Sequence, residues 1–195
     1  DAIDFSYMGV LDSIADYAGE LAWRVEQENA NRRHIVIVAH SMGGLVTRYY
    51  LKNLRTTDQV KTVITVATPH HGTFGGMILP PRSTPTSEML PGSPFLEELN
   101  SVSETAPGVG FHAIWTPTDG VVIPAENSIM CGARNYKVSG LGVTHLGLLM
   151  SDAAYAIVLD VLRGRKPPTT GPQTRDHYEA RENPLPWLKL RDERQ

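Results

Sequence analysis

Apolar residues along the chain follow two spacings, one typical of helices and the other of buried strands. Near the N-terminus they recur every three or four positions, which predicts a helix with one apolar stripe. The stripe consists of Leu11, Ile14, Ala18, Leu21, Ala22 and Val25. Ile35–Val38 is instead a continuous β-branched run, which predicts a strand covered on both faces. Asp1–Phe5 resembles the end of another strand.

The alternation of helix and strand continues along the chain. The pattern predicts a helix over 45–54, a second buried strand over 60–66, further strands over 110–115 and 136–138, and a last amphipathic helix over 146–163. Short buried strands that alternate with helices indicate a mostly parallel sheet flanked by helices, which is an α/β fold. We therefore assign residues 1–163 to one α/β domain.

Two segments interrupt this pattern. Residues 73–108 contain six prolines and only one convincing short helix, around Phe95–Leu99. A long irregular excursion inside a compact domain is usually functional or disordered, and we interpret this one as a small cap-like or lid-like insertion. Residues 164–195 are rich in proline and charge and predict an extended C-terminal tail.

Composition narrows the class of protein only modestly. A chain of 195 residues with 41% hydrophobic and 20% charged residues fits one globular domain that buries roughly 70% of its unfolded surface. The net charge of −3 gives no reason to expect nucleic acid as a partner, and no apolar run reaches the roughly 18 residues of an integral membrane segment. Cys131 is the single cysteine, so no intrachain disulfide forms. The compartment, secreted or cytoplasmic, and the oligomeric state stay open.

The strongest chemical signal is the segment Ala39–Gly44, Ala-His-Ser-Met-Gly-Gly, between a predicted strand and a predicted helix. This is the nucleophile-elbow pattern, with alanine in the first glycine position. A sharp strand-to-helix reversal leaves room only for small residues two positions either side of Ser41. The turn lifts the Ser41 hydroxyl out of the sheet and lets the Met42 N–H face a developing oxyanion. The alternative is a plain Ser-Gly turn without chemistry.

A serine hydroxyl needs a base to take its proton and an acid to orient that base. Of the seven histidines, His145 is the best base because it lies in a loop after a strand and directly before the last helix. The alternative for His145 is an exposed histidine at the start of a helix. His40 adjoins the serine but is expected to point elsewhere, which favours a packing role.

The acid should fall between the serine and the histidine in chain order. Asp119 lies in a turn after the predicted strand 110–115, at the carboxyl edge of the sheet. Glu126 is the second choice because it shares that loop. The alternative role for Asp119 is an Asx-type turn that closes on Gly120.

Four motifs in this order resemble the bacterial lipase/esterase branch of the α/β-hydrolase superfamily, which includes triacylglycerol lipases. The matching stretches are 34–51, 66–73, 115–124 and 142–150. The resemblance implies an α/β-hydrolase fold with a Ser41–His145–Asp119 triad. It also implies a small-molecule or lipid ester with an apolar acyl chain as substrate, and transient contact with a lipid interface. No cofactor is required.

The resemblance further implies that 69–73 line the mouth of the active site and that 73–108 form a cap or acyl-binding wall. The candidate substrate-binding residues are His40, His70, His71, Met77 and Leu79. For any single apolar residue of the cap, ordinary packing is an equally good explanation. Because the adjacent His70 and His71 point in different directions and no third ligand is apparent, no metal site is predicted.

The sequence departs from the family pattern at its start. The family's sheet includes an earlier strand beside the one at 35–38, and the loop after that strand supplies a second oxyanion donor. Neither is found in this sequence, so we expect an N-terminally incomplete α/β-hydrolase, the C-terminal part of a longer protein. The expected reaction is ester hydrolysis through an acyl-enzyme. An acyltransferase or thioesterase with the same triad, or a non-catalytic fragment, are the alternatives.

Overall fold

A computed structural model of the protein describes residues 3–6, 12–29, 34–75 and 84–168. Its centre is a parallel sheet of four strands in the order β1-β2-β3-β4. The strands are β1 (Ile35–His40), β2 (Val60–Val66), β3 (Gly110–Trp115) and β4 (Arg134–Lys137). The helices are α1 (Ile14–Asn29), α2 (Met42–Tyr49), η1 (Tyr50–Leu54), α3 (Thr84–Glu88), α4 (Pro94–Asn100), η3 (Ala125–Ser128), η4 (Gly147–Met150) and α5 (Asp152–Leu162).

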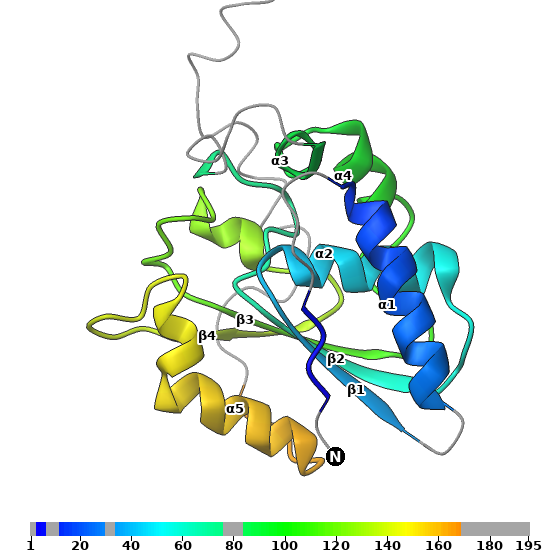
Figure 1. Cartoon of the computed structure of the whole chain (residues 1–195). Helices are drawn as coiled ribbons and strands as arrows, with labels where there is room; N and C mark the ends of the chain where they lie inside the picture. Colours follow the sequence, from blue (N-terminus) through cyan, green and yellow to red (C-terminus); the bar gives the residue numbers. More distant parts are fainter. Residues whose placement is uncertain (1–2, 7–11, 30–33, 76–83, 169–195) are drawn as a thin grey trace, which may run out of the picture.

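Helices cover both faces of the sheet, which gives three layers (Figure 1). On one face α1, α2 and α4 bury the larger core, in which Leu45 of α2 and Val63 of β2 are fully buried. On the other face α5 packs over Ile64 of β2 and Ile114 of β3. The predicted α/β fold with a parallel sheet and flanking helices is therefore confirmed. Among the described residues, no helix is long and apolar enough to cross a membrane.

The predicted helices form near their expected positions, with shifts at their ends. The first forms as α1, whose apolar stripe faces the larger core, while Leu11 lies outside the described residues. The second begins earlier than predicted, at Met42, because the chain enters α2 directly after Ser41. The last is divided at Ser151, whose side chain accepts a hydrogen bond from the Ala154 N–H at 3.4 Å and caps α5.

Two strand predictions need correction. Ile35–Val38 is not covered on both faces, because Val36 and Val38 are 38% and 52% exposed. Within the described residues β1 pairs only with β2, and the core under α5 contains no side chain of β1. Of the strand end predicted at Asp1–Phe5, the described residues Ile3–Phe5 have no regular secondary structure.

The insertion predicted over 73–108 packs on the body of the domain wherever the structure describes it. Residues 84–108 form α3 and α4, and Met89, Leu96 and Leu99 belong to the larger core. Met89 therefore takes part in ordinary core packing, the alternative that the sequence left open for the apolar residues of the cap. Outside the described residues lie 76–83 of this insertion and 169–195 of the predicted tail.

Candidate active site

The predicted chemistry gathers at the carboxyl edge of the sheet, where the loops after parallel strands meet. Ser41 follows β1, Asp119 follows β3 and His145 follows β4. Their side chains form one hydrogen-bonded row, with Ser41 Oγ 3.0 Å from His145 Nε2 and His145 Nδ1 2.9 Å from Asp119 Oδ2. The fold thus brings together the three residues predicted as nucleophile, base and acid.

Ser41 lies at a sharp turn between β1 and α2. Its backbone has φ 52° and ψ −128°, a conformation that residues other than glycine rarely adopt. The Ser41 N–H donates to the Val66 carbonyl at 2.9 Å, which ties the turn to the end of β2, and the Gly44 N–H donates to the Ser41 carbonyl at 3.1 Å. Met42 begins α2, so its N–H belongs to the first turn, where amides have no intrahelical acceptor.

His145 is held by the tight turn 142–147. The Thr144 carbonyl accepts a hydrogen bond from the Leu148 N–H at 2.9 Å, and the Thr144 hydroxyl oxygen accepts one from the Gly147 N–H at 3.2 Å. The His145 side chain is only 8% exposed. The turn therefore fixes the imidazole before any ligand arrives.

Asp119 is a buried carboxylate that orients His145. Its Oδ1 accepts hydrogen bonds from the N–H groups of Val121 and Val122, both at 2.8 Å. Burial opposes ionisation of this carboxyl, but the hydrogen bonds from His145, Val122 and Val121 outweigh burial and lower its pKa. Because a carboxylate only accepts, His145 carries its proton on Nδ1, and Nε2 accepts from the Ser41 hydroxyl.

Two other sequence candidates do not belong to this row. Glu126, the second choice for the acid, lies in η3, and Asp119 occupies the position beside His145. His40 packs its ring against His145, with 4.7 Å between the ring centroids, and its Nε2 donates to the His145 carbonyl at 3.2 Å. Burial and the neighbouring His145 lower the pKa of His40. His40 therefore supports the backbone of the base.

His70 does not line the mouth of the site, contrary to the prediction. Its side chain is fully buried. The Arg48 guanidinium donates to His70 Nδ1 at 3.4 Å, and His70 Nε2 donates to the Thr65 hydroxyl at 3.1 Å. Both ring nitrogens are thus bound to protein groups and do not face a substrate. The other predicted substrate contacts, Met77 and Leu79, lie outside the described residues.

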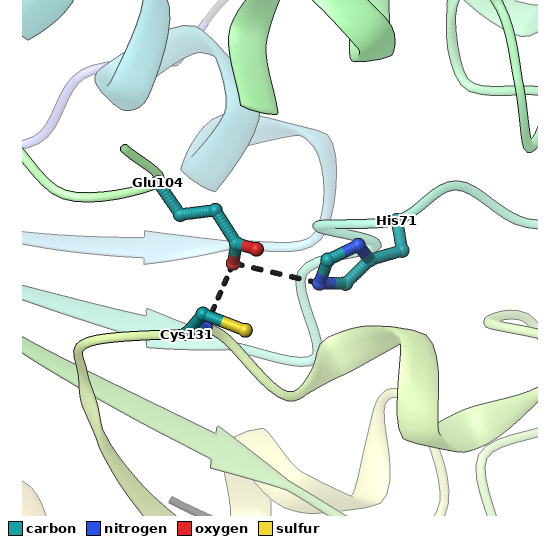
Figure 2. A group of neighbouring side chains, drawn as sticks. All are labelled: His71, Glu104 and Cys131. Atoms are coloured by element: carbon teal, nitrogen blue, oxygen red, sulfur yellow. Dashed lines mark hydrogen bonds and ion pairs between the residues drawn. The ribbon is translucent and has the colours of Figure 1, made fainter. Parts of the chain in front are cut away.

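His71 lies against Glu104 and Cys131 (Figure 2). Its Nε2 is 3.4 Å from Glu104 Oε2, and the Cys131 N–H donates to the same oxygen at 2.7 Å. No metal site was predicted from the sequence, because no third ligand was apparent beside the paired histidines. The fold brings two ligand-type residues to His71 from distant parts of the chain.

Thr73 belongs to the segment 69–73 that was predicted to line the mouth, but its contacts were not foreseen from the sequence. Its hydroxyl donates to the Val121 carbonyl at 2.6 Å and accepts from the N–H groups of Ile123 and Gly75, both at 2.9 Å. It therefore joins the loop after β2 to the loop that carries Asp119. Thr73 belongs to the matching stretch 66–73, but that motif does not indicate which loop the Thr73 hydroxyl contacts.

The loops that carry Asp119 and His145 also expose large apolar side chains, which we call the apolar rim. The apolar rim consists of Val121, Ile123, Leu141, Leu146, Leu149 and Met150, which are 42% to 108% exposed. Clustered exposed apolar side chains are typical of binding surfaces for apolar ligands. Apolar substrate contacts were predicted only in the insertion, because the spacing of hydrophobic residues along the chain does not show which of them are exposed.

We predict that Gly147→Ala destabilises the fold through the turn that carries His145. A Cβ at this position would lie 2.0 Å from the Gly142 carbonyl oxygen, which is backbone and cannot rotate away. The turn must shift, and overpacking of this kind costs about 1–3 kcal/mol. Urea denaturation followed by circular dichroism measures the free energy of unfolding.

Gly120→Ala is the matched control, because it makes the same change in the loop that carries Asp119. A Cβ there meets no atom within 4 Å, so the free energy of unfolding should stay within about 0.5 kcal/mol of the unsubstituted protein. Equal stabilities for Gly147→Ala and the unsubstituted protein would show that the turn has more room than the structure gives it.

Solved structures of lipases share this fold at low sequence identity. Aspergillus fumigatus lipase B matches with a TM-score of 0.68 at 19% identity, over 78% of this chain and 42% of the other. Mature Bacillus licheniformis lipase BlEst2 matches with a TM-score of 0.64 at 16% identity, over 77% of this chain and 75% of the other. A lipase-esterase related protein from Clostridium acetobutylicum has a TM-score of 0.50 at 12% identity, over 83% of this chain and 79% of the other.

The chain therefore has the same α/β-hydrolase fold as these lipase structures. At these identities the similarity shows the fold alone. The sequence model of the PGAP1-like α/β domain matches residues 6–76, a stretch that includes the Ser41 turn. The chain spans less than half the length of the Aspergillus lipase, 42%.

Proposed function

We propose that the protein is a serine carboxylester hydrolase of the lipase/esterase kind, with Ser41 as the nucleophile. The observation that carries the proposal is the row from Ser41 Oγ to His145 Nε2 at 3.0 Å and from His145 Nδ1 to Asp119 Oδ2 at 2.9 Å. A serine, a neutral imidazole and a buried carboxylate in this order make an activated nucleophile.

The proposed reaction passes through an acyl-enzyme. Ser41 Oγ attacks the ester carbonyl while His145 Nε2 takes the hydroxyl proton, and the charged Asp119 stabilises the resulting imidazolium. His145 then returns this proton to the departing alcohol. A water molecule gives a proton to the same Nε2 as it attacks the acyl-enzyme. Nε2 then returns this proton to Ser41 Oγ as the acid departs, which restores the free enzyme. No cofactor takes part in these steps.

The oxyanion that forms during each attack needs hydrogen-bond donors. The Met42 N–H is the proposed donor because it directly follows the nucleophile and opens α2. The strained backbone of Ser41 supports this role, since the same turn orients both the hydroxyl and the next N–H.

The proposed substrates are esters with an apolar acyl chain, either lipids or small molecules. Support comes from the apolar rim, which surrounds Asp119 and His145 in sequence and is well exposed. An acyl chain that covers these side chains removes apolar surface from water, at about 25 cal/mol per Å². Esters with longer acyl chains cover more of this surface and should bind more tightly.

An ester panel tests this function. We expect the full chain to hydrolyse p-nitrophenyl esters, with kcat/KM rising from the acetate to the butyrate and the octanoate. Ser41→Ala protein, prepared in the same way, gives the background rate. Absence of hydrolysis above this background, from a chain that circular dichroism shows to be folded, would contradict the proposal.

The same panel separates the related reactions. Added methanol should compete with water only in proportion to its concentration, whereas an acyltransferase would form the methyl ester preferentially. A thioesterase would cleave the matched octanoyl thioester with a much higher kcat/KM than the oxygen ester. Either result would keep the Ser41 nucleophile and change the acceptor or the leaving group.

A further inference from the structure

Three side chains from separate loops converge away from the Ser41 row. His71 comes from the loop after β2, Glu104 from the segment after α4, and Cys131 from the segment between η3 and β4 (Figure 2). One ligand-type atom from each residue lies within 4.8 Å of the other two. His71 and Glu104 have side-chain exposures of 16% and 8%, so the group is shielded but still reached by solvent.

The residue types and their spacing fit zinc. An imidazole nitrogen and a carboxylate oxygen each bind zinc at about 2.0–2.2 Å, so at a tetrahedral angle they lie about 3.3 Å apart. His71 Nε2 and Glu104 Oε2 are 3.4 Å apart. The Cys131 sulfur lies within 4.8 Å of both atoms. A zinc-bound thiolate sulfur lies about 3.6 Å from the other ligands, so a shift of about 1 Å brings it to the corresponding position. A thiolate with an imidazole favours zinc over calcium or magnesium, which prefer oxygen ligands.

The backbone around these side chains is already held in place. The His71 N–H donates to the Asn127 carbonyl at 3.2 Å, and the Asn127 amide donates to the His71 carbonyl at 3.2 Å. The Cys131 N–H donates to Glu104 Oε2 at 2.7 Å, and Arg48 Nε donates to the Glu104 carbonyl at 3.0 Å. A metal ion therefore meets ordered loops, and little conformational entropy is lost on binding.

The charges near the cluster are compatible with a divalent ion. Glu104 supplies a carboxylate to the cluster. The buried Arg48, whose Nε donates to the Glu104 carbonyl at 3.0 Å, is the neighbouring positive charge. Binding of zinc releases the Cys131 thiol proton to water. Zinc, carboxylate and thiolate then sum to zero charge, which limits repulsion from Arg48.

We propose that His71, Glu104 and Cys131 bind one zinc ion, with water as the fourth ligand. The ion would join three loops that are distant in the sequence. One of them leads through Gly72 to Thr73, which contacts the loop of Asp119. The zinc ion would thus hold these loops together and take no part in ester chemistry. The proposal does not depend on the proposed hydrolase function.

Cobalt titration of the metal-free full chain tests the site. Thiolate-bound Co²⁺ gives a near-ultraviolet charge-transfer band, and we expect one equivalent to produce it and one equivalent of Zn²⁺ to remove it. Because Cys131 is the only cysteine in the chain, its alkylation by iodoacetamide should also slow when Zn²⁺ is added. Absence of the band, or equal alkylation rates with and without Zn²⁺, would overturn the proposal.

Variants separate this site from adventitious metal binding. Cys131→Ser should lose the cobalt band and bind Zn²⁺ about 100-fold more weakly or worse, because even the loss of an outer hydrogen bond to a metal ligand costs about 10–100-fold. His34→Asn, which removes an exposed histidine outside the cluster, should bind Zn²⁺ like the unsubstituted chain. Unchanged affinity in Cys131→Ser, or a loss in His34→Asn, would place the metal elsewhere.

A stability measurement guards against a folding artefact. Zn²⁺ should raise the Tm of the unsubstituted chain and leave that of Cys131→Ser unchanged, while the two metal-free proteins melt within a few degrees of each other. Covalent labelling of Ser41 by a fluorophosphonate should survive in Cys131→Ser. Failure of the zinc site and failure of the hydrolase function are thereby told apart.

Discussion

Ser41→Ala is expected to abolish covalent labelling by a fluorophosphonate and to reduce ester hydrolysis by about 10⁶-fold in kcat. Ser41 Oγ is the atom that donates to His145 Nε2 at 3.0 Å, and alanine leaves no oxygen to attack phosphorus or carbon. Intact-mass analysis of the full chain should show one adduct before the substitution and none after it. Labelling displaces fluoride and therefore reports the activated hydroxyl without a choice of ester.

Ser87→Ala is the matched control, since it removes an exposed hydroxyl of α3. It should keep both the adduct and the rate of ester hydrolysis. An adduct that persists in Ser41→Ala would assign the reactive group to another residue. A folded chain that takes up no reagent would favour a binding protein that retains the hydrolase fold without the reaction.

Asp119→Asn should lower kcat/KM by about 10⁴-fold and leave the fold intact. The asparagine oxygen can still accept from the Val121 and Val122 N–H groups at the Oδ1 position, so the loop keeps its shape. The asparagine NH₂ group would face His145 in place of Oδ2. This NH₂ group cannot accept a hydrogen bond from Nδ1–H, so the imidazole changes tautomer and carries its proton on Nε2. Nε2 can then no longer take the Ser41 proton. Steady-state ester kinetics measure the loss, and urea denaturation checks the stability.

Glu126→Gln makes the same chemical change at the other carboxylate considered for the acid. Glu126 lies in η3, and Asp119 occupies the position beside His145. The kcat/KM of Glu126→Gln should therefore stay within about twofold of the unsubstituted protein. A large loss in Glu126→Gln together with a small one in Asp119→Asn would exchange the two assignments. Equal large losses would indicate that the whole loop, and no single carboxylate, orients His145.

Local sequence was enough to predict most of the elements and the three residues that form the row at the carboxyl edge of the sheet. The run Ile35–Val38, the short Ala-His-Ser-Met-Gly-Gly segment and the apolar residues after it define a strand, a turn and a helix without reference to distant contacts. The order of serine, acid and histidine, each placed after a predicted strand, was then sufficient to select Asp119 and His145. Parallel strands end at one edge, so residues that follow them meet there.

Solvent exposure could not be predicted in the same way. A β-branched run is equally compatible with one covered face or two. Only the tertiary structure shows that Val36 and Val38 are exposed, in a strand at the edge of the described sheet. The spacing of the apolar residues in the insertion likewise does not show which of them are exposed. In the structure Met89 is buried in the larger core, and the exposed apolar rim lies on other loops.

The sequence by itself thus determined the α/β class and selected Ser41, Asp119 and His145 as the predicted nucleophile, acid and base, because these choices depend on spacing within short segments. Only the tertiary structure decided the roles of the adjacent His70 and His71. One is fully buried against Arg48 and Thr65, and the other meets Glu104 and Cys131. Neighbouring residues in a loop differ in the direction of their side chains. That direction is set by contacts with segments that are distant in the sequence. These contacts cannot be predicted from the spacing of residues along the chain.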